Sequence, residues 1–182
     1  MSFDQSFARV VGIEGRYSND PNDAGGETMF GITITTARTF GYRGPMKDMP
    51  LTVAEDIYRR GWWDLLRLDD VANIAGARIA DELFECGVNI APSKAAGFLQ
   101  RALNSFNQRG AHYPDIKADG NLGPATLATL RAFMQRRKLT GEVVMLNALN
   151  AQQGAYYLER GEARPQNEDF TFGWFANRVR IA

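Results

Sequence analysis

The sequence predicts a mainly α-helical protein with a small β-hairpin. Apolar residues recur at helical spacing over most of its 182 residues, and short segments rich in Gly, Asn, Asp and Pro separate these stretches. β-Branched residues cluster in one short stretch, "MFGITITT". With 45% hydrophobic residues, the chain has the composition of an ordinary globular protein, with room for one domain or two small lobes that share a core.

The first predicted element is a helix over about residues 3–13. Ser2 and Gln5 have the spacing of a capping box, and the apolar residues that follow recur at helical period. Proline and glycines in the segment 15–33 prevent this helix from continuing. We therefore expect an irregular loop or a small β-hairpin there.

Three more helical stretches follow in the first half. One precedes Gly41, and a second covers "VAEDIYRRGWWDLLRL", for which Thr52 and Glu55 have capping-box spacing. The third runs without a break through "NIAGARIADELFECGVNI" and ends near Pro92. Helix is thus expected over most of residues 34–91.

The second half is predicted to be helical as well. One helix opens at Ser93, and another begins at Pro124 and ends at Gly141. A last long helix, "EVVMLNALNAQQGAYYLERG", precedes a loop and a short terminal segment. No repeat or long linker occurs, so we expect a compact unit with a catalytic lobe at 1–90 and a lobe at 91–182 that completes the core.

Charge and residue counts exclude several classes of function. The 21 basic and 21 acidic residues cancel, which argues against nucleic-acid binding. Cys86 and His112 are the only residues of their kinds, so an intramolecular disulfide or a Cys/His zinc cluster is excluded, and we expect no metal and no cofactor. The N-terminus lacks the pattern of a signal peptide and no run of about 18 apolar residues occurs, so we expect synthesis in the cytoplasm and no membrane insertion.

Glu14 stands at the junction between the first helix and the polar segment. Carbonyl groups at the end of a helix disfavour an ionised carboxyl, and nearby apolar side chains would do the same, so the pKa of Glu14 should be raised. Asp20 and Asp23 follow in a polar setting where a carboxylate stays ionised. A protonated Glu beside a charged Asp is the pair that glycoside hydrolysis uses, although an acidic residue before a turn is also common without any catalytic role.

Four sequence blocks resemble one known enzyme family and the region that accompanies it. The stretch "IEGRYSNDPNDAGGETMFGIT" resembles the hallmark of the glycoside hydrolase family 108 muramidases, which are phage and bacterial lysozyme-like enzymes. "LTVAEDIYRRGWWDLLRLDD" and "LFECGVNIAPSKAAGFLQRALN" are similar to later segments of that family. "ADGNLGPATLATL" resembles the peptidoglycan-related region that accompanies it at the C-terminal side.

The resemblance implies roles for particular residues. Glu14 would be the catalytic acid, Asp23 the first choice and Asp20 the second for its assisting carboxylate, and Thr28 would position water. The interval from Asp23 to Thr28 is one residue shorter than in phage-type lysozymes. Arg16 replaces the second Gly of the family motif, where it would be strained at positive φ, or would hydrogen-bond the substrate or lower the pKa of Glu14.

Four residues are predicted to contact the sugar. Tyr17 and Phe30 flank the hairpin, Trp63 could stack on a pyranose, and Asn89 could bind an amide. Each also has a structural reading: the tyrosine and phenylalanine would support the loop, and one of Trp62 and Trp63 would belong to the core because neighbours on a helix point in different directions. Glu85 occupies an acidic family position and would either orient Asn89 or lie on the helix surface.

The resemblance also implies a function. The expected fold is lysozyme-like with its hairpin next to the active cleft, and the expected reaction is cleavage of the β-1,4 bond between N-acetylmuramic acid and N-acetylglucosamine in bacterial peptidoglycan. A monomeric phage endolysin, released by a holin to act on the cell wall in the periplasm, fits this reading. A lytic transglycosylase and a non-catalytic peptidoglycan-binding or secretion-associated protein are the alternatives.

Overall fold

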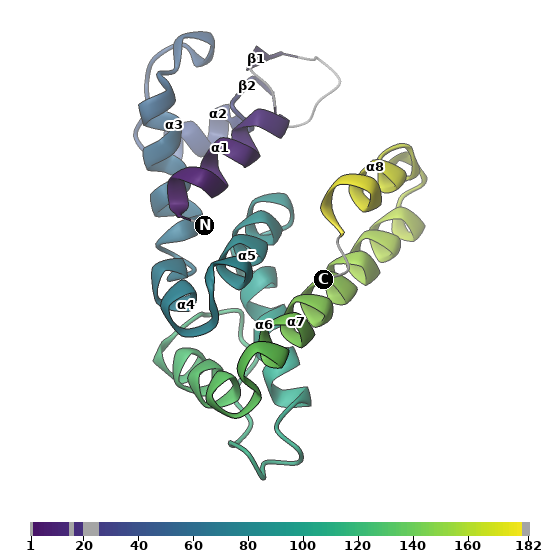
Figure 1. Cartoon of the computed structure of the whole chain (residues 1–182). Coiled ribbons are helices and arrows are strands. Elements are labelled where there is room, and N and C mark those ends of the chain that lie inside the picture. Colours follow the sequence, from purple (N-terminus) through teal and green to yellow (C-terminus); the bar gives the residue numbers. More distant parts are fainter. Residues whose placement is uncertain (1, 15–16, 20–25, 180–182) are drawn as a thin grey trace. The chain divides into compact units, whose positions relative to one another are not determined.

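Helices make up most of the computed structural model, which describes residues 2–14, 17–19 and 26–179 (Figure 1). The chain forms two compact units, Met1–Asp64 and Leu65–Ala182, which are described separately below. The prediction of a mainly helical protein with a small antiparallel β-element is confirmed. Among the described residues, no helix combines the length and apolar character needed to cross a membrane.

The first unit begins with α1, Phe3–Glu14, which confirms the predicted first helix. The backbone N–H of Ser2 donates to Oε1 of Gln5 at 3.0 Å, one of the two bonds of the predicted capping box. The other helical elements of this unit are α2 (Ile34–Thr39), the 3₁₀ turn η1 (Met46–Asp48), α3 (Leu51–Tyr58) and the π-helical turn η2 (Arg59–Trp63).

Three two-residue strands form the antiparallel sheet of the first unit. They are β1 (Tyr17–Ser18), β2 (Thr28–Met29) and β3 (Ile32–Thr33), in the order β1-β2-β3. β2 and β3 make the predicted hairpin, and β1 adds a strand in which Tyr17 pairs with Met29. The two-residue turn at Phe30 and Gly31 has φ of 53° and 75°, and positive φ at both positions is what a type I′ hairpin turn requires.

The predicted start of α3 is wrong. Thr52 lies inside the helix, which begins at Leu51 after Pro50, and no side chain caps it. The carbonyl of Pro50 accepts from the N–H of Val53 at 3.0 Å, so the fixed backbone of the proline starts the first turn. A capping-box spacing therefore occurs here without the capping role.

The core of the first unit is rich in aromatic rings. Phe3 stacks on Phe7 with ring centroids 5.7 Å apart, and the edge of Trp63 meets the ring of Phe3 at 5.4 Å. Phe7 in turn meets Tyr58 edge-on at 5.6 Å. Rings from α1, α3 and η2 thus form one cluster, which attaches the helix that ends at Glu14 to α3 and η2.

The second unit is helical throughout its regular elements (Figure 1). They are α4 (Leu68–Ala75), α5 (Ala77–Asn89), α6 (Pro92–Ser105), α7 (Pro124–Ala163), the 3₁₀ turn η3 (Pro165–Asn167) and α8 (Glu168–Arg178). α5 packs against α4, α6 and α7, and α8 packs against α7. The buried side chains of this core include Leu83, Phe84, Leu99, Leu103, Leu130 and Phe133.

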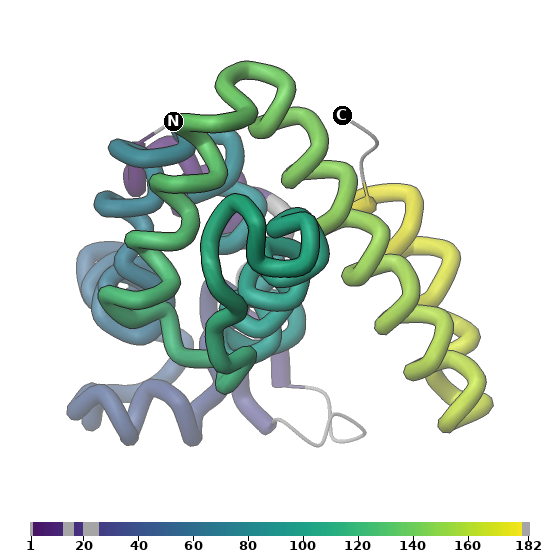
Figure 2. The backbone as a smooth tube through the Cα atoms, turned by 90° about the horizontal axis from the view of Figure 1, so that it is seen from below, coloured from purple at the N-terminus to yellow at the C-terminus, as the bar shows by residue number. Residues whose placement is uncertain are grey.

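Two helix boundaries of this unit were predicted wrongly. The segment expected as one continuous helix breaks at Gly76, whose φ of 94° separates α4 from α5. The predicted division into two helices is present in α7, but it lies at Lys138, three residues before Gly141, where φ is 51° and ψ is −138°. The green part of the tube in Figure 2 shows the change of direction. A Cβ atom at Gly141 would lie 3.2 Å from the ring of Phe133, so this glycine allows close packing and does not end the helix.

The loop between α6 and α7 is held by side-chain amides. Gln100 is 1% exposed, and its Nε2 lies 3.1 Å from Oδ1 of Asp119, 3.1 Å from Oγ1 of Thr126 and 2.9 Å from the carbonyl of Asn121. Its Oε1 accepts from the N–H of Gly120 at 2.9 Å. The "ADGNLGPAT" segment is therefore scaffold.

The predicted lobe boundary at residues 90/91 falls between α5 and α6 inside the second unit, and the division of roles between lobes stays a prediction.

Candidate active site

The predicted catalytic acid is the last residue of α1. The backbone of Glu14 closes the helix, while its side chain lies outside the described part of the chain. Val10, one turn earlier, is 4% exposed and belongs to the core. The carbonyls at this end of α1 carry the negative end of the helix dipole, so the backbone position is one that disfavours an ionised carboxyl. The helix-end placement of Glu14 is thus confirmed, and its catalytic role stays a prediction.

The predicted assisting carboxylates, Asp20 and Asp23, lie outside the described residues, as does Arg16. The strands on either side of the segment that carries the two aspartates are described, and Ser18 of β1 pairs there with Thr28 of β2. Antiparallel pairing brings the two ends of the aspartate-bearing segment side by side, directly after the end of α1. The roles of both aspartates and of the arginine remain predictions.

Thr28 lies in the central strand of the sheet. Its backbone pairs with Ser18 on one side and with Thr33 on the other, and its side chain is half-buried. A residue in a central strand is fixed by two neighbours, which suits a hydroxyl that has to hold a water molecule in place. The proposed water-positioning role of Thr28 is not tested by this placement.

The turn of the hairpin is tied to the aromatic core by one long-range hydrogen bond. The hydroxyl of Tyr58 donates to the backbone carbonyl of Phe30 at 3.0 Å. Tyr58 is 1% exposed, so the bond is made where water does not compete. Sequence reasoning missed this residue, although a tyrosine inside an apolar stripe is a sign that its hydroxyl has a specific partner.

The aromatic residues predicted to contact sugar lie in different surroundings. Tyr17 on β1 is 42% exposed, and Phe30 at the turn is half-buried, so both have surface that a ligand can reach. Trp63 is 1% exposed and packs on Phe3, which leaves no ring face for a pyranose. Its predicted sugar contact is therefore corrected to a core role. Trp62 is half-buried with its ring 5.1 Å from that of Tyr58.

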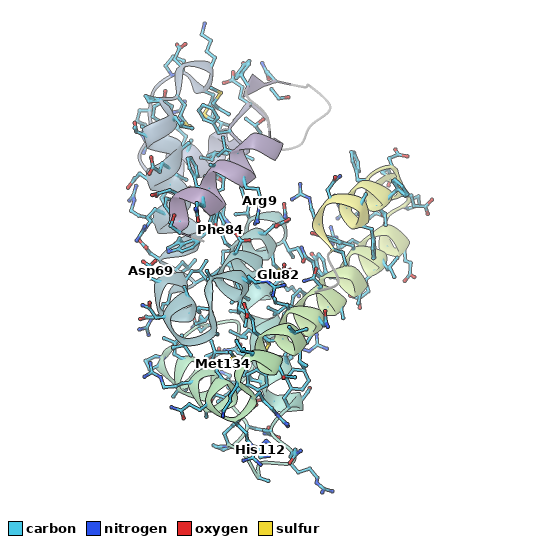
Figure 3. The ribbon with its side chains drawn as sticks, viewed as in Figure 1. Arg9, Asp69, Glu82, Phe84, His112 and Met134 are labelled. Carbon is cyan, nitrogen blue, oxygen red and sulfur yellow. The ribbon has the colours of Figure 1, made fainter. Side chains whose placement is uncertain are left out.

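Asn89, the remaining predicted contact, belongs to the second unit. It is the last residue of α5 and is half-buried. Glu85 on the same helix is 6% exposed, so it is not the surface carboxylate that one reading of the sequence predicted. Figure 3 shows Glu82 on this helix, one turn before Cys86.

The single cysteine is not poised for nucleophilic chemistry. Burial raises the pKa of the Cys86 thiol far above its usual value, and the charges of Glu82 and Glu85 raise it further. A neutral, buried thiol is inert at physiological pH. The single histidine, His112, lies in the loop between α6 and α7 (Figure 3), where desolvation and the charge of Arg136 lower its pKa.

Metal binding depends on the part of the chain that the structure leaves open. In the described ranges, no three His, Cys, Asp or Glu side chains come together in a way that could hold a metal ion. Asp20 and Asp23 are outside those ranges, so the expected absence of a metal stays an expectation.

Comparisons with known proteins agree with this arrangement. A family model described as Glycosyl hydrolase 108 matches residues 7–90, and one described as Predicted Peptidoglycan domain matches residues 94–179. Residues 7–90 therefore form a glycosyl hydrolase 108 domain, as the resemblance implied. Glu14, the sheet and Asn89 all fall within the glycosyl hydrolase match, and the amide-held loop falls within the peptidoglycan-domain match.

A solved structure shows the same fold. SagA from Brucella abortus superposes with a TM-score of 0.74 at 24% sequence identity, covering 98% of this chain and 90% of that chain. The predicted lysozyme-like, mainly helical fold is confirmed. No match was found among curated protein sequences. With a glycosyl hydrolase 108 domain and a peptidoglycan domain, the protein is a peptidoglycan hydrolase of the glycoside hydrolase class.

Proposed function

We propose that this glycosyl hydrolase 108 protein is an N-acetylmuramidase, which cleaves the β-1,4 bond between N-acetylmuramic acid and N-acetylglucosamine. The observation that carries the proposal is the position of Glu14, which is the last residue of α1 and lies directly before the segment that enters the sheet. An acid at this helix end holds its proton more tightly, as a general acid for a leaving glycosidic oxygen must.

The proposed reaction divides the work between two carboxyl groups. Glu14 gives its proton to the departing oxygen as the bond to the anomeric carbon breaks, and a water molecule supplies the hydroxyl that replaces it. Asp23, or Asp20 as second choice, stabilises the positive charge on the sugar ring or activates this water, which Thr28 positions. Tyr17, Phe30 and Asn89 contact the sugar or its amides.

The local framework supports this division. The bond from Tyr58 to the carbonyl of Phe30 fixes the hairpin turn, and the pairing of Ser18 with Thr28 fixes the ends of the aspartate-bearing segment. Catalytic geometry has to be held to within a fraction of an ångström, so these two ties are what the site requires of its scaffold.

The digestion of purified peptidoglycan, with the released muropeptides identified by mass spectrometry, tests the proposal. We expect reducing muramic-acid ends from the wild type and from Glu27→Gln, a control that removes a carboxyl from the neighbouring strand region. Glu14→Gln should release about 10²- to 10⁴-fold less, the usual contribution of a general acid. The appearance of 1,6-anhydro ends would identify a lytic transglycosylase, and no products from the wild type would identify a non-catalytic peptidoglycan-binding protein.

The biological setting is part of the same proposal. The resemblance to phage lytic enzymes favours an endolysin that is made in the host cytoplasm, acts as a monomer and reaches the cell wall in the periplasm through a holin pore. Expression in a Gram-negative host with and without a co-expressed holin tests this. Lysis that depends on the holin is the expected result, and lysis at the same rate without it contradicts the export route.

A further inference from the structure

We propose that a groove in the second unit binds the acidic peptide stems of peptidoglycan, at a site separate from the bond that is cleaved. The groove has a volume of about 480 Å³ and is called here the α7 groove. Its lining includes Arg67, Leu127, Ala128, Arg131, Ala132 and Gln135. The inference rests on peptidoglycan as the substrate and not on which glycosidic bond is broken.

Two arginines from distant parts of the sequence meet at this groove. Arg131 on α7 is exposed, and no described residue forms an ion pair or hydrogen bond with its side chain. Arg67 precedes α4, and its Nε and Nη2 donate to one oxygen of Asp70 at 3.0 and 2.7 Å. Its Nη1 donors remain for another acceptor. Among the described residues that line the groove, none is acidic. Arg67 is paired with Asp70 beside the groove, so Arg131 is the cation there that has no carboxylate partner among the described residues.

The backbone of Arg67 supports a binding role for its side chain. Its φ of 50° and ψ of 43° are left-handed, a conformation that residues other than glycine rarely adopt. Such strain persists where the surrounding structure enforces it, and it gathers at ligand sites. Here it occurs at the residue that brings the second guanidinium to the groove.

The remainder of the groove indicates the kind of ligand. Leu127 is 7% exposed and, with Ala128 and Ala132, forms an apolar floor suited to methyl groups. The amide of Gln135 can both donate to a carbonyl and accept from an N–H group. Cations, a small apolar floor and an amide together match a short peptide with free carboxylates and alanine side chains. The stem peptides of peptidoglycan belong to this class, whereas its amino-sugar backbone offers no comparable run of carboxylates.

Direct binding tests the proposal independently of catalysis. A synthetic stem pentapeptide, Ala-γ-D-Glu-Lys-D-Ala-D-Ala, is titrated into the full chain by calorimetry. We expect Arg131→Gln to weaken binding about tenfold or more, as expected for the loss of a charge-assisted hydrogen bond. Arg136→Gln is the matched control, because it removes the same charge from an exposed position of α7 that does not line the groove and should bind as the wild type does.

The following results would each overturn the proposal. They are unchanged binding by Arg131→Gln, equal binding of a pentapeptide with amidated carboxylates, and complete competition by inorganic phosphate at the peptide's own concentration, which would indicate a general anion site. Equal weakening by Arg136→Gln would likewise show that net charge and not the groove attracts the peptide.

Turnover separates this proposal from the muramidase proposal. On intact peptidoglycan, Arg131→Gln should raise KM and leave kcat unchanged. On glycan strands stripped of their peptides, it should equal the wild type. A loss of activity on stripped strands would contradict the peptide site. If the wild type cleaves neither substrate, the muramidase proposal fails, and the calorimetric result for the groove still stands.

Discussion

The two units hold their irregular segments in different ways. In the first unit, the hairpin turn is anchored by one long-range bond, from the hydroxyl of Tyr58 to the carbonyl of Phe30, and by a cluster of rings. In the second unit, the loop between α6 and α7 is anchored by buried amides, with Gln100 at their centre. The first arrangement depends on apolar area, and the second on directional bonds.

Further bonds in the second unit follow the same scheme. Asn104 donates to the carbonyl of Ile116 at 2.8 Å and accepts from its N–H at 2.9 Å. Gly120 has φ of 75°, and a Cβ there would lie 2.7 Å from the carbonyl oxygen of Ser93, so no larger residue fits. The loop is thus held at several points, whereas in the described part of the chain the turn near the candidate site is held by the bond from Tyr58 and by the packing of the rings.

This difference has a consequence for mutation. Side chains that hold the loop of the second unit should govern stability and leave the chemistry intact. Side chains that hold the sheet of the first unit should affect both, because the same ties position the candidate catalytic groups. The following predictions test that separation.

The largest effect on stability is expected in the aromatic cluster. Trp63→Ala removes a fully buried ring that packs on Phe3, and the cavity should lower the free energy of unfolding by about 3–5 kcal/mol. Tyr17→Ala, at an exposed position, should change it by less than about 1 kcal/mol and raise KM. Urea denaturation of both variants measures this. A small effect of Trp63→Ala would show that the rings do not hold the first unit together.

The amide network of the second unit comes next. Gln100→Ala leaves the N–H of Gly120 and other buried groups without their partner, which should cost roughly 2–4 kcal/mol. The control is Asn121→Ala, because that residue contributes its backbone N–H and carbonyl to the network. The same urea experiment gives both values. Turnover of peptide-free glycan by folded Gln100→Ala should match the wild type. A drop in kcat would show that the loop of the second unit also affects catalysis, which contradicts the proposed separation.

A smaller change in stability should have a clearer effect on catalysis. Tyr58→Phe keeps the ring and loses the bond to Phe30, at a cost of about 1 kcal/mol. Because the hairpin turn is then free to shift, kcat should fall at temperatures where the variant is fully folded. Tyr42→Phe is the control, since the Tyr42 hydroxyl donates locally to the carbonyl of Pro45. Equal kcat for the two variants would mean that the tie does not serve the site.

The smallest effect at neutral pH concerns Tyr157 of the second unit. Burial raises its pKa to about 12, partly offset by the bond from Gln153. The folded state therefore holds this proton more tightly than the unfolded state, in which the pKa is about 10. Its contribution to stability is full below pH 10 and is lost as the pH rises through 12. Tyr157→Phe should lose less stability than the wild type across this interval, and a parallel loss would contradict the assignment.

Local patterns in the sequence predicted most of the fold. The capping residues of α1, the proline that opens α7 and the β-branched hairpin all depend on near neighbours, and these elements are present. The break at Gly76 was missed, because glycine is tolerated inside helical patterns. The break at Lys138 was predicted three residues too late, because a lysine gives no sign of positive φ. Packing against Phe133, and not helix termination, explains Gly141.

The features of the candidate site also fall into those that local sequence predicts and those that depend on distant contacts. The end of the first helix at Glu14 follows from composition that changes within a few residues. The bond between Tyr58 and Phe30 spans 28 positions, and no local pattern indicates it. The burial of Trp63 likewise depends on a contact with Phe3 near the other end of the first unit, so sequence alone could not decide between core and sugar contact.

The most direct test of the central claim, that Glu14 is a general acid, compares two substrates of different leaving groups. Glu14→Gln and the wild type are assayed on a peptidoglycan oligosaccharide, whose sugar oxygen needs a proton to leave, and on an aryl glycoside, whose phenolate does not. A large loss of kcat on the oligosaccharide with near wild-type turnover of the aryl glycoside is the predicted result. Equal losses on both substrates, or no loss on either, would contradict it.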